Sequence, residues 1–181
     1  MSRKPLIVGL GGTARAGSTS ERALRLALES AAKLGCDTRL FGGPDLPAEF
    51  YAVELSARGA RALALVDALR AADGVIVASP GYHGSISGLV KNALDYAEDL
   101  RADARPYLEG RAIGLIVTAD GPQALGSTLA TLRAIAHALR GWPTPYAALI
   151  NTGKPAAVAA QMQAVDIVAA QVTQFARRMR A

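Results

Sequence analysis

The sequence predicts one α/β domain across residues 1–181, built on five parallel strands in the doubly wound order 2-1-3-4-5 with helices on both faces. Three observations predict this architecture. Short continuous apolar runs alternate with longer stretches whose apolar residues recur at helical spacing. Strict alternation of strand and helix is typical of a parallel sheet. The chain holds five such units, which favours this order over the six-stranded dinucleotide-binding order.

The first half of the chain opens with the apolar run Leu6 to Leu10, which leads into glycines and is typical of a strand buried on both faces. A helical pattern follows it, and Gly35 ends that helix. In this half we expect, in order, a strand over 5–10, a helix over 19–34, a strand over 38–41, a loop over 42–56, a helix over 56–72 and a strongly buried strand over 74–78.

The second half repeats the alternation after a loop rich in Gly, Ser and Pro. A Gly-Trp-Pro-Thr-Pro segment at 141–145 interrupts the pattern before the last strand. In this half we expect, in order, a loop over 79–87, a helix over 89–100, a strand over 111–118, a helix over 125–139, a short strand over 146–150 and a long closing helix over 158–179.

The composition narrows the protein class. Hydrophobic residues make up 51% of the chain and charged residues 19%, so the chain can fill a core and is unlike a disordered one. Apolar runs are strand-sized, so we expect no membrane span and no signal peptide. The single cysteine, Cys36, rules out an internal disulfide and fits a cytoplasmic location. The net charge of +5 is dispersed, which favours a solvated basic surface over nucleic-acid binding.

Two loops carry the residues that suggest chemistry. In an open parallel sheet, ligands bind beyond the carboxyl ends of the strands, at the point where the strand order reverses. In the order 2-1-3-4-5 the loops 11–20 and 79–87 meet at that point. They are also the richest stretches in glycine and hydroxyl residues, so topology and composition independently predict a ligand site there.

The first loop suits a phosphate group. Glycines let the backbone approach a ligand, and amide groups at the start of the following helix attract an anion. Four hydroxyl residues and Arg15 add hydrogen-bond donors. The alternative is a capping box between Ser18 and Glu21, which needs no ligand.

Missing residues exclude several phosphate-site classes. Ser18 stands where a nucleoside triphosphatase loop would carry its lysine. The end of the second strand lacks the acidic residue that a dinucleotide site places on the ribose. A Cys-x5-Arg phosphatase loop is absent, because Cys36 and Arg39 have the wrong spacing. A monophosphate site without a metal remains.

The second loop offers flat side chains at the same place. Tyr82 and His83 could face a flat heterocycle, and their backbone amides could reach its edge. The alternatives are an exposed loop histidine at His83 and partial packing of Tyr82 under the following helix. A third loop, 118–123, follows the next strand and could border the other side of such a ring.

At these residues the sequence resembles the NAD(P)H-dependent FMN reductase family of flavodoxin-like proteins. The family motif Gly-Ser-x-Arg-x-x-Ser corresponds here to Gly-Thr-Ala-Arg-Ala-Gly-Ser at residues 12–18, where Thr13 replaces the serine and keeps the hydroxyl. The motif Pro-x-Tyr-x-x-Ser-x-x-Gly appears at residues 80–88, and a Lys-Asn pair and a helix follow at 91–96. The resemblance covers the whole order of elements and implies a flavodoxin-like fold.

The resemblance also implies a cofactor and its contacts. FMN would accept a hydride at N5 from NADPH or NADH, with no catalytic side chain and no metal. The residues it implies are Thr13, Arg15, Ser18, Thr19 and Ser20 along the phosphate, Pro80, Gly81, Tyr82, His83, Gly84 and Ser85 along the isoalloxazine ring, and Thr118, Ala119, Asp120 and Gly121 on its far side. Many relatives have Glu at the position of Gly81 and Asn at that of His83.

Partners and rival functions follow from the same resemblance. The helix 89–100 would pack against a second copy in a homodimer or homotetramer, and reduced flavin could supply a monooxygenase. A quinone, azo-dye or metal-oxyanion reductase would share the cofactor. A flavodoxin-like electron carrier is disfavoured by the charge of +5, because such carriers are acidic. A regulatory or nucleic-acid-binding domain would bind no flavin. We expect His137 and Cys36 to be structural.

Overall fold

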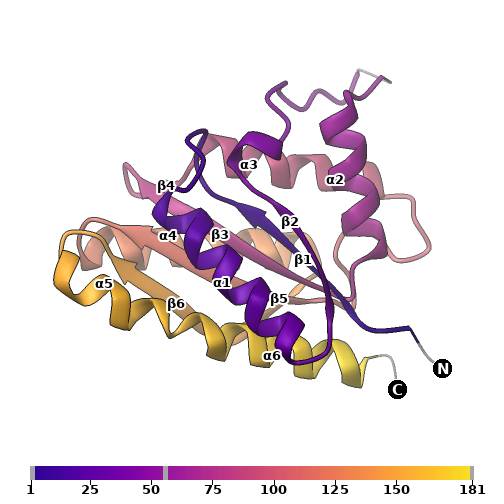
Figure 1. Cartoon of the computed structure of the whole chain (residues 1–181). Helices are drawn as coiled ribbons and strands as arrows, with labels where there is room; N and C mark the ends of the chain where they lie inside the picture. Colours follow the sequence, from indigo (N-terminus) through magenta and orange to yellow (C-terminus); the bar gives the residue numbers. More distant parts are fainter. Residues whose placement is uncertain (1–2, 55–56, 180–181) are drawn as a thin grey trace.

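The computed structural model describes residues 3–54 and 57–179. Its main sheet has five parallel strands in the order β2-β1-β3-β5-β6 (Figure 1). The strands are β1 (Leu6–Gly11), β2 (Asp37–Phe41), β3 (Gly74–Tyr82), β5 (Ala112–Ala119) and β6 (Trp142–Asn151). The predicted order 2-1-3-4-5 is therefore confirmed for these five. A sixth, two-residue strand, β4 (Ser85–Ile86), pairs antiparallel with β3 and was not predicted.

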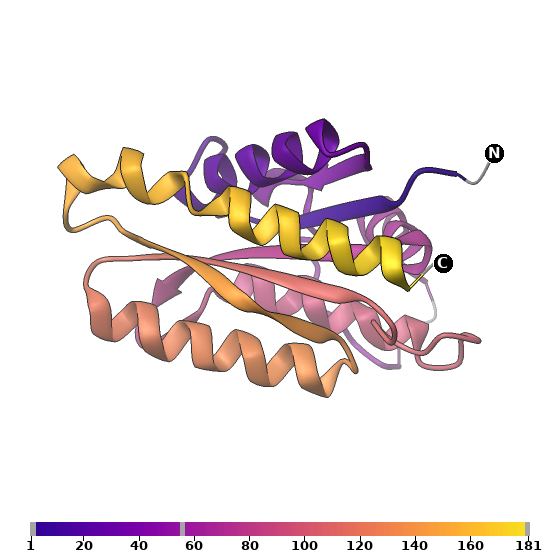
Figure 2. The ribbon, with the colours of Figure 1, turned by 90° about the horizontal axis from the view of Figure 1, so that it is seen from below.

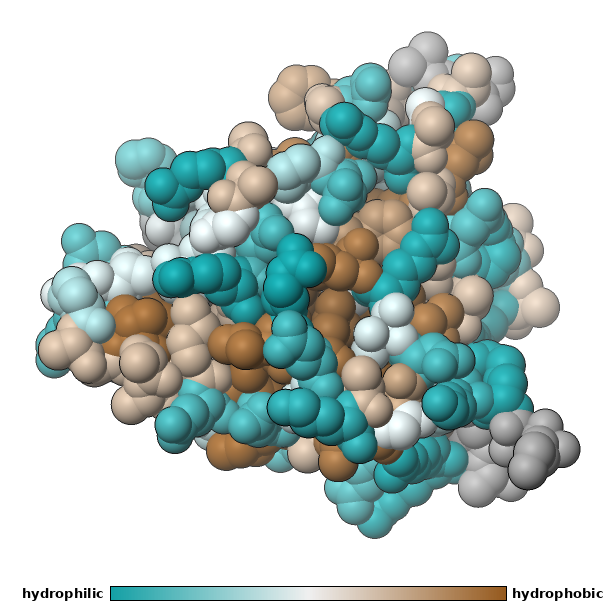
Figure 3. All heavy atoms as spheres, in the orientation of Figure 1, coloured by the Kyte–Doolittle hydropathy of each residue, from teal (hydrophilic) through white to brown (hydrophobic). Residues whose placement is uncertain are grey.

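Helices cover both faces of the sheet, as predicted. Figure 2 shows α1 and α6 on one side of the sheet and α4 on the other. The helices are α1 (Thr19–Lys33), α2 (Ala60–Ala71), α3 (Gly88–Asp95), α4 (Pro122–Ala138), α5 (Pro155–Met162) and α6 (Val165–Arg178), with short 3-10 helices η1 (Gly43–Asp45) and η2 (Tyr96–Leu100). Along the face covered by α1, α5 and α6, apolar side chains are interrupted by hydrophilic ones (Figure 3).

The central strands are buried on both faces because their side chains alternate between two cores. Val75 and Val77 lie in the core with α2, α3 and α4, whereas Ile76 and Ala78 lie in the core with α1 and α6. Every residue from Gly74 to Pro80 is buried. A continuous apolar run was the right signal for such a strand.

The loop predicted over 79–87 was wrong. β3 continues to Tyr82, and Tyr82 pairs with Ser85 of β4 across a two-residue turn. The φ angles of His83 and Gly84 are 50° and 85°. Positive φ at both central residues is what a type I′ hairpin turn requires, so the Gly- and Ser-rich stretch encodes a tight hairpin.

Three further boundaries differ from the predictions. β6 begins at Trp142, because an edge strand tolerates prolines such as Pro143 and Pro145 where no partner strand needs their N–H. The closing helix is divided at 163–164 into α5 and α6. The helix over 89–100 tightens into η2 after Asp95. The start expected for the second helix, Ser56, lies outside the described residues.

The two ends of the sheet carry different segments. The start of β1 and the end of α6 lie at its amino end, and the hairpin of β3 and β4 lies at the opposite, carboxyl end (Figure 1). Among the residues that the structure describes, no helix is both long and apolar enough to cross a membrane.

Candidate functional site

The carboxyl ends of the strands bring the three predicted loops to one edge of the sheet. Gly11 of β1 is level with Ala78 of β3, and Pro80 is level with Thr118 of β5. Thr118 in turn is level with Ile150 of β6. The first loop (residues 12–18), the β3–β4 hairpin and the third loop (residues 120–121) therefore leave the sheet side by side.

Glycines allow the first loop to leave β1 in close contact with its neighbours. The φ angle of Gly12 is 106°, and its N–H donates to the carbonyl of Ala78 at 3.1 Å. A Cβ at Gly11 would overlap the same carbonyl oxygen. A Cβ at Gly43, after β2, would overlap the carbonyl of Thr13. Side chains at these positions would push the loop away from the sheet.

The hydroxyl groups of the first loop are partly used within the protein. The Thr13 hydroxyl accepts from the N–H of Arg15 at 3.2 Å and donates to the Arg15 carbonyl at 3.1 Å. Ser18 is the N-cap of α1, and its Oγ accepts from the N–H of Glu21 at 3.3 Å. Ser18 and Ser20 are both buried, with their hydroxyls 3.4 Å apart. Thr19 is half-buried.

The cap kept as an alternative in the sequence analysis is present in a modified form. Ser18 bonds Glu21 as a capping box requires, but the Glu21 carboxylate accepts from the N–H of Gly17, at 3.2 Å, and not from that of Ser18. Arg25 holds the other carboxylate oxygen at 3.1 Å. Glu21 is 6% exposed, so a buried acidic group lies beneath the loop.

The loop nevertheless keeps donors for an anion. Arg15 is exposed, and its guanidinium forms no hydrogen bond or ion pair with any residue that the structure describes. The amides of Thr19 and Ser20 are the first of α1 and have no acceptor within the helix. The positive end of the helix dipole adds to their attraction for negative charge. A phosphate-sized anion fits this chemistry.

The β3–β4 hairpin presents its side chains to solvent at the same edge. Tyr82 is 50% exposed, and His83 and Gly84 are also exposed. Half of the surface of Tyr82 is therefore open to a ligand. His83 adopts φ 50°, a left-handed conformation that His tolerates better than a β-branched residue does.

Helix α4 holds the hairpin from below. The hydroxyl of the fully buried Thr128 donates to the carbonyl of Ser85 at 3.3 Å. A Cβ at Gly81 would lie 2.7 Å from that hydroxyl oxygen and 3.0 Å from Cβ of Ala119. A larger residue at position 81 would clash there, which explains why this chain carries glycine. At the hairpin base, Ser79 Oγ accepts from the N–H of Ser87 at 3.1 Å.

The third loop is shaped by a residue that the sequence analysis missed. Thr118 and Ala119 end β5 and are buried, whereas Asp120 is exposed. Asn151, at the end of β6, accepts through Oδ1 from the N–H groups of Gly121 at 3.1 Å and Gly153 at 3.0 Å. An Asn at the end of a strand, two residues before a glycine, could have signalled this role.

Perturbed pKa values occur outside this edge. A hydrogen bond from Arg58 lowers the pKa of Asp99, and the two side chains form a bidentate pair with both distances at 2.8 Å. Burial raises the pKa of Tyr51, whose ring stacks under the Arg58 guanidinium. Burial also lowers the pKa of Arg111, to about 10.

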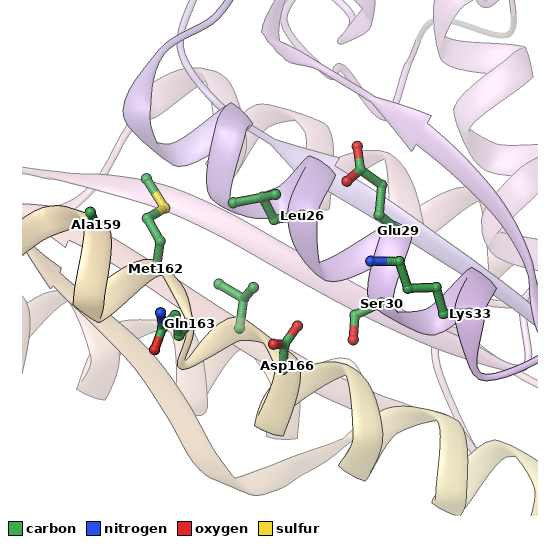
Figure 4. A pocket seen from close by; sticks show the side chains of 9 residues that line it. Leu26, Glu29, Ser30, Lys33, Ala159, Met162, Gln163 and Asp166 are labelled. Atoms are coloured by element: carbon green, nitrogen blue, oxygen red, sulfur yellow. The ribbon is translucent and has the colours of Figure 1, made fainter.

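Two residues that were expected to be structural, and one surface groove, lie away from the carboxyl edge of the sheet. Cys36 is buried and contacts Thr173 at 3.6 Å, as expected of a packed residue, whereas His137 is exposed on α4. A groove of about 260 Å³ lies between α1 and the α5–α6 pair, and Figure 4 shows Glu29 and Lys33 on α1 along one side and Met162 and Asp166 on α5 and α6 along the other. No predicted site residue lines that groove.

Sequence comparison finds related proteins. The model of a family described as NADPH-dependent FMN reductase matches residues 5–155. An FMN-dependent NADPH-azoreductase of Staphylococcus aureus (strain USA300) is 40% identical over 75 residues, which are 41% of this chain. The aligned segment spans 36% of that relative's length.

Structural comparison finds the same fold. A flavodoxin, WrbA-like protein from Agrobacterium tumefaciens superposes with a TM-score of 0.71 at 19% identity, covering 96% of this chain and 98% of that one. An NADH:FMN oxidoreductase in its apo form gives 0.67 at 21% identity, with 93% and 90% covered. These likenesses confirm the flavodoxin-like fold.

Proposed function

The chain belongs to the NADPH-dependent FMN reductase family, and on that premise we propose that it is an oxidoreductase that uses NADPH or NADH to reduce FMN. The observation that carries the proposal is the first loop. It joins a donor-rich helix start to Arg15, a cation without a partner among the described residues, at the edge where this fold binds ligands. A phosphate monoester would supply the negative charge that pairs with Arg15 and accepts from these amides.

The shape of the edge supports a flavin mononucleotide. A Cβ added to Gly17, Gly84 or Gly121 would meet no atom within 4 Å, so each of the three loops borders open space. Their φ angles are 69°, 85° and 101°, which favour glycine. Polar donors at the first loop and an aromatic side chain on the hairpin match the two ends of such a ligand.

We propose that the phosphate is held at the first loop by charge and backbone donors. Arg15 would supply the charged contact, and the free amides of α1 and the Thr19 hydroxyl would complete it. Thr13 and Ser18 already bond the loop backbone, so they would act mainly by shaping it. Ser20 would support Ser18 from its buried position.

The isoalloxazine ring would lie along the hairpin. Tyr82 and His83 would offer their exposed faces, and the backbone from Pro80 to Ser85 would lie along the ring edge, with N–H donors from Gly81 onward because Pro80 has none. On the far side, Thr118 and Ala119 end β5, and Asp120 and Gly121 form the bordering turn. Gly81 leaves no side chain between the hairpin and α4.

The residues of this chain would position the reactants rather than transfer protons. When bound, FMN accepts a hydride from the nicotinamide. Arg15 would anchor one end of the flavin, and Tyr82 would limit the access of water to the other. The hairpin is fixed by Thr128 and by its tight turn, so the ring would meet a preformed surface.

The electron acceptor is a separate question. Reduced flavin could be released to a monooxygenase, or it could reduce a quinone, an azo dye or a metal oxyanion at the open edge. The azoreductase relative favours an azo substrate as the second candidate. The buried Cys36 fits a cytoplasmic location.

A homodimer or homotetramer is also part of the proposal. The apolar side chains of α3 face this chain's own core, apart from the half-buried Leu89. The neighbouring loop instead exposes Phe50 by 85% and Val53 by 72%, and Asn92 of α3 holds that loop through the N–H of Tyr51 at 2.8 Å. We expect light scattering to give at least twice the chain mass, and a clean monomer would overturn this part.

One experiment tests the activity. The protein is purified with FMN, its visible spectrum is recorded, and NADH and NADPH oxidation is followed with free FMN, a quinone or an azo dye as acceptor. We expect flavin binding and nicotinamide oxidation. Flavin colour without nicotinamide oxidation would favour an electron carrier, and no flavin binding would overturn the proposal.

A further inference from the structure

Glu21 is a buried carboxylate in a loop that should favour negative ligands. It is 6% exposed, and it lies at the third position of α1, where the helix dipole is positive. A Cβ at Gly12 would lie 3.2 Å from the Glu21 Cβ, and one at Gly42 would lie 3.1–3.4 Å from its carboxylate. The charge is therefore enclosed by the two backbone segments that support the first loop.

The Glu21 carboxylate occupies a donor of that loop. The N–H of Gly17 donates to its Oε2 at 3.2 Å. Gly17 lies in the middle of the motif whose backbone would meet a phosphate, and it has φ 69°. The carboxylate thus takes one loop amide and part of the positive potential of the helix start before any ligand arrives.

The neutralisation of Glu21 by its partner is incomplete. Arg25 contacts Oε1 at 3.1 Å, but its side chain is 56% exposed while that of Glu21 is 8% exposed. Solvent screens an exposed cation more than a buried anion, so Arg25 offsets the negative charge of Glu21 only in part.

We propose that Glu21 is an internal anion that opposes the phosphate of FMN and keeps the flavin exchangeable, so that FMN behaves as a substrate that leaves rather than as a permanently held cofactor. The inference rests on the proposed function. Glu21 has a second effect, because its bond to Gly17 holds the loop in shape when no flavin is present. The loop stays preformed, and the charge limits how tightly the phosphate is retained.

The variant Glu21→Gln separates these two effects. A glutamine oxygen can still accept from the N–H of Gly17, so the loop keeps its support while the charge disappears. We expect FMN to bind about tenfold more tightly, the size of an unscreened charge interaction at a partly buried site. Its release rate should fall by a similar factor.

Riboflavin provides the internal control, because it has the ring but no phosphate. Its affinity should change less than about twofold in Glu21→Gln. Glu29→Gln is the matched variant: it removes the same charge from the same helix, but at the groove of Figure 4, about 12 Å along the axis. Binding of both flavins is measured by fluorescence quenching, and release by stopped flow.

Three results would overturn the inference: an unchanged FMN affinity in Glu21→Gln, an equal gain for riboflavin, or an equal gain in Glu29→Gln. A weaker FMN affinity in Glu21→Gln, in a variant that unfolds at the wild-type temperature, would also overturn it and leave Glu21 as a brace only. If the wild-type protein binds neither flavin, the proposed function itself fails.

Discussion

At the amino edge of the sheet, arginines are bonded to the protein itself, whereas at the carboxyl edge Arg15 makes no such bond with the described residues. Arg3 forms a bidentate pair with Asp73 at 2.7 and 3.1 Å. The fully buried Arg111 donates to the carbonyls of Arg70, Ala72 and Tyr107 at 2.9–3.0 Å. Arg15 faces solvent beside glycines.

Under the proposed function, residues that stabilise the fold and residues that bind the ligand lie at opposite ends of one sheet. Arg111 donates to carbonyl groups at the carboxyl terminus of α2, and Arg105 donates to the same carbonyls of Arg70 and Ala72. The first loop instead leaves two helix amides and the Arg15 cation without a partner among the described residues, which costs stability and would suit a ligand. Changes at the amino edge should therefore alter unfolding without altering flavin binding, and changes at the carboxyl edge should do the reverse.

The largest effect should come from Arg111→Met. Methionine removes the charge-assisted hydrogen bonds that Arg111 makes to the carbonyls of Arg70, Ala72 and Tyr107, so we expect a loss of about 3–4 kcal/mol in the free energy of unfolding. Urea unfolding measures the loss, and FMN affinity should stay unchanged. Arg101→Met is the control, because that side chain is 74% exposed and its loss should cost under about 0.5 kcal/mol. Equal losses in both variants would contradict the stabilising role given to Arg111.

Arg15→Ala should show the opposite pattern. We expect FMN binding to weaken by about 1.5–3 kcal/mol, the range for a hydrogen bond to a charged group. The free energy of unfolding should change by less than about 0.5 kcal/mol, because the side chain is exposed. Arg22→Ala, an exposed arginine one turn into α1, is the matched control for charge. An unchanged FMN dissociation constant in Arg15→Ala would remove Arg15 from the site.

The sequence was sufficient to predict the strand order and to bring the loops of the candidate site to one edge of the sheet. Continuous apolar runs such as Gly74 to Ala78 marked strands buried on both faces, and topology located the edge. The hairpin was missed because a Gly- and Ser-rich stretch suits a loop and a type I′ turn equally well. Only the pairing of Tyr82 with Ser85 distinguishes them.

The finer details of the site depend on contacts between distant segments. Ser18 and Glu21 suggested a cap, but the choice of Gly17 as the partner of the carboxylate depends on how the loop folds against Gly42 and Gly43. Asn151 reaches the third loop because β6 lies beside β5. No local pattern specifies such contacts.

The loop 46–54 follows β2 at the carboxyl edge, but Arg58 and helix α3 fasten it with bonds like those of the amino edge. Arg58 pairs with Asp99 and stacks on Tyr51 and Tyr96. We expect Asp99→Asn to cost about 1–2 kcal/mol of stability at pH 7, with FMN affinity unchanged. A fall in FMN affinity would show that this segment belongs to the site.

The same variant should lose its effect in acid. The pKa of Asp99 is lowered in the folded protein, so the pair stabilises the fold above the unfolded value of about 3.9 and this stabilisation disappears as the pH falls through the folded value. The difference between wild type and Asp99→Asn should therefore shrink below about pH 4. Asp95→Asn is the control, because its pair with Lys91 is exposed and should contribute under about 0.5 kcal/mol.

The smallest effects should come from replacing two glycines that both have room for a side chain but differ in their φ angle. A Cβ at Gly17 or at Gly126 would meet no atom within 4 Å, so alanine is sterically free at both positions. Gly126 lies within α4, where alanine should add about 0.5–1 kcal/mol of stability. Gly17 has φ 69°, where alanine should cost about 1 kcal/mol.

Only Gly17→Ala should also change FMN binding, because the strain falls on the loop whose amide Glu21 holds. Thermal unfolding and FMN titration of both variants measure the two effects. If alanine stabilises the protein at both positions, the first loop is not held in its left-handed conformation, and the carboxyl edge is then less preformed than its glycines indicate. A loss of stability in Gly17→Ala together with a gain in Gly126→Ala would show that the first loop is held in a left-handed conformation that glycine favours. That conformation costs some stability and keeps the loop amides exposed to a ligand.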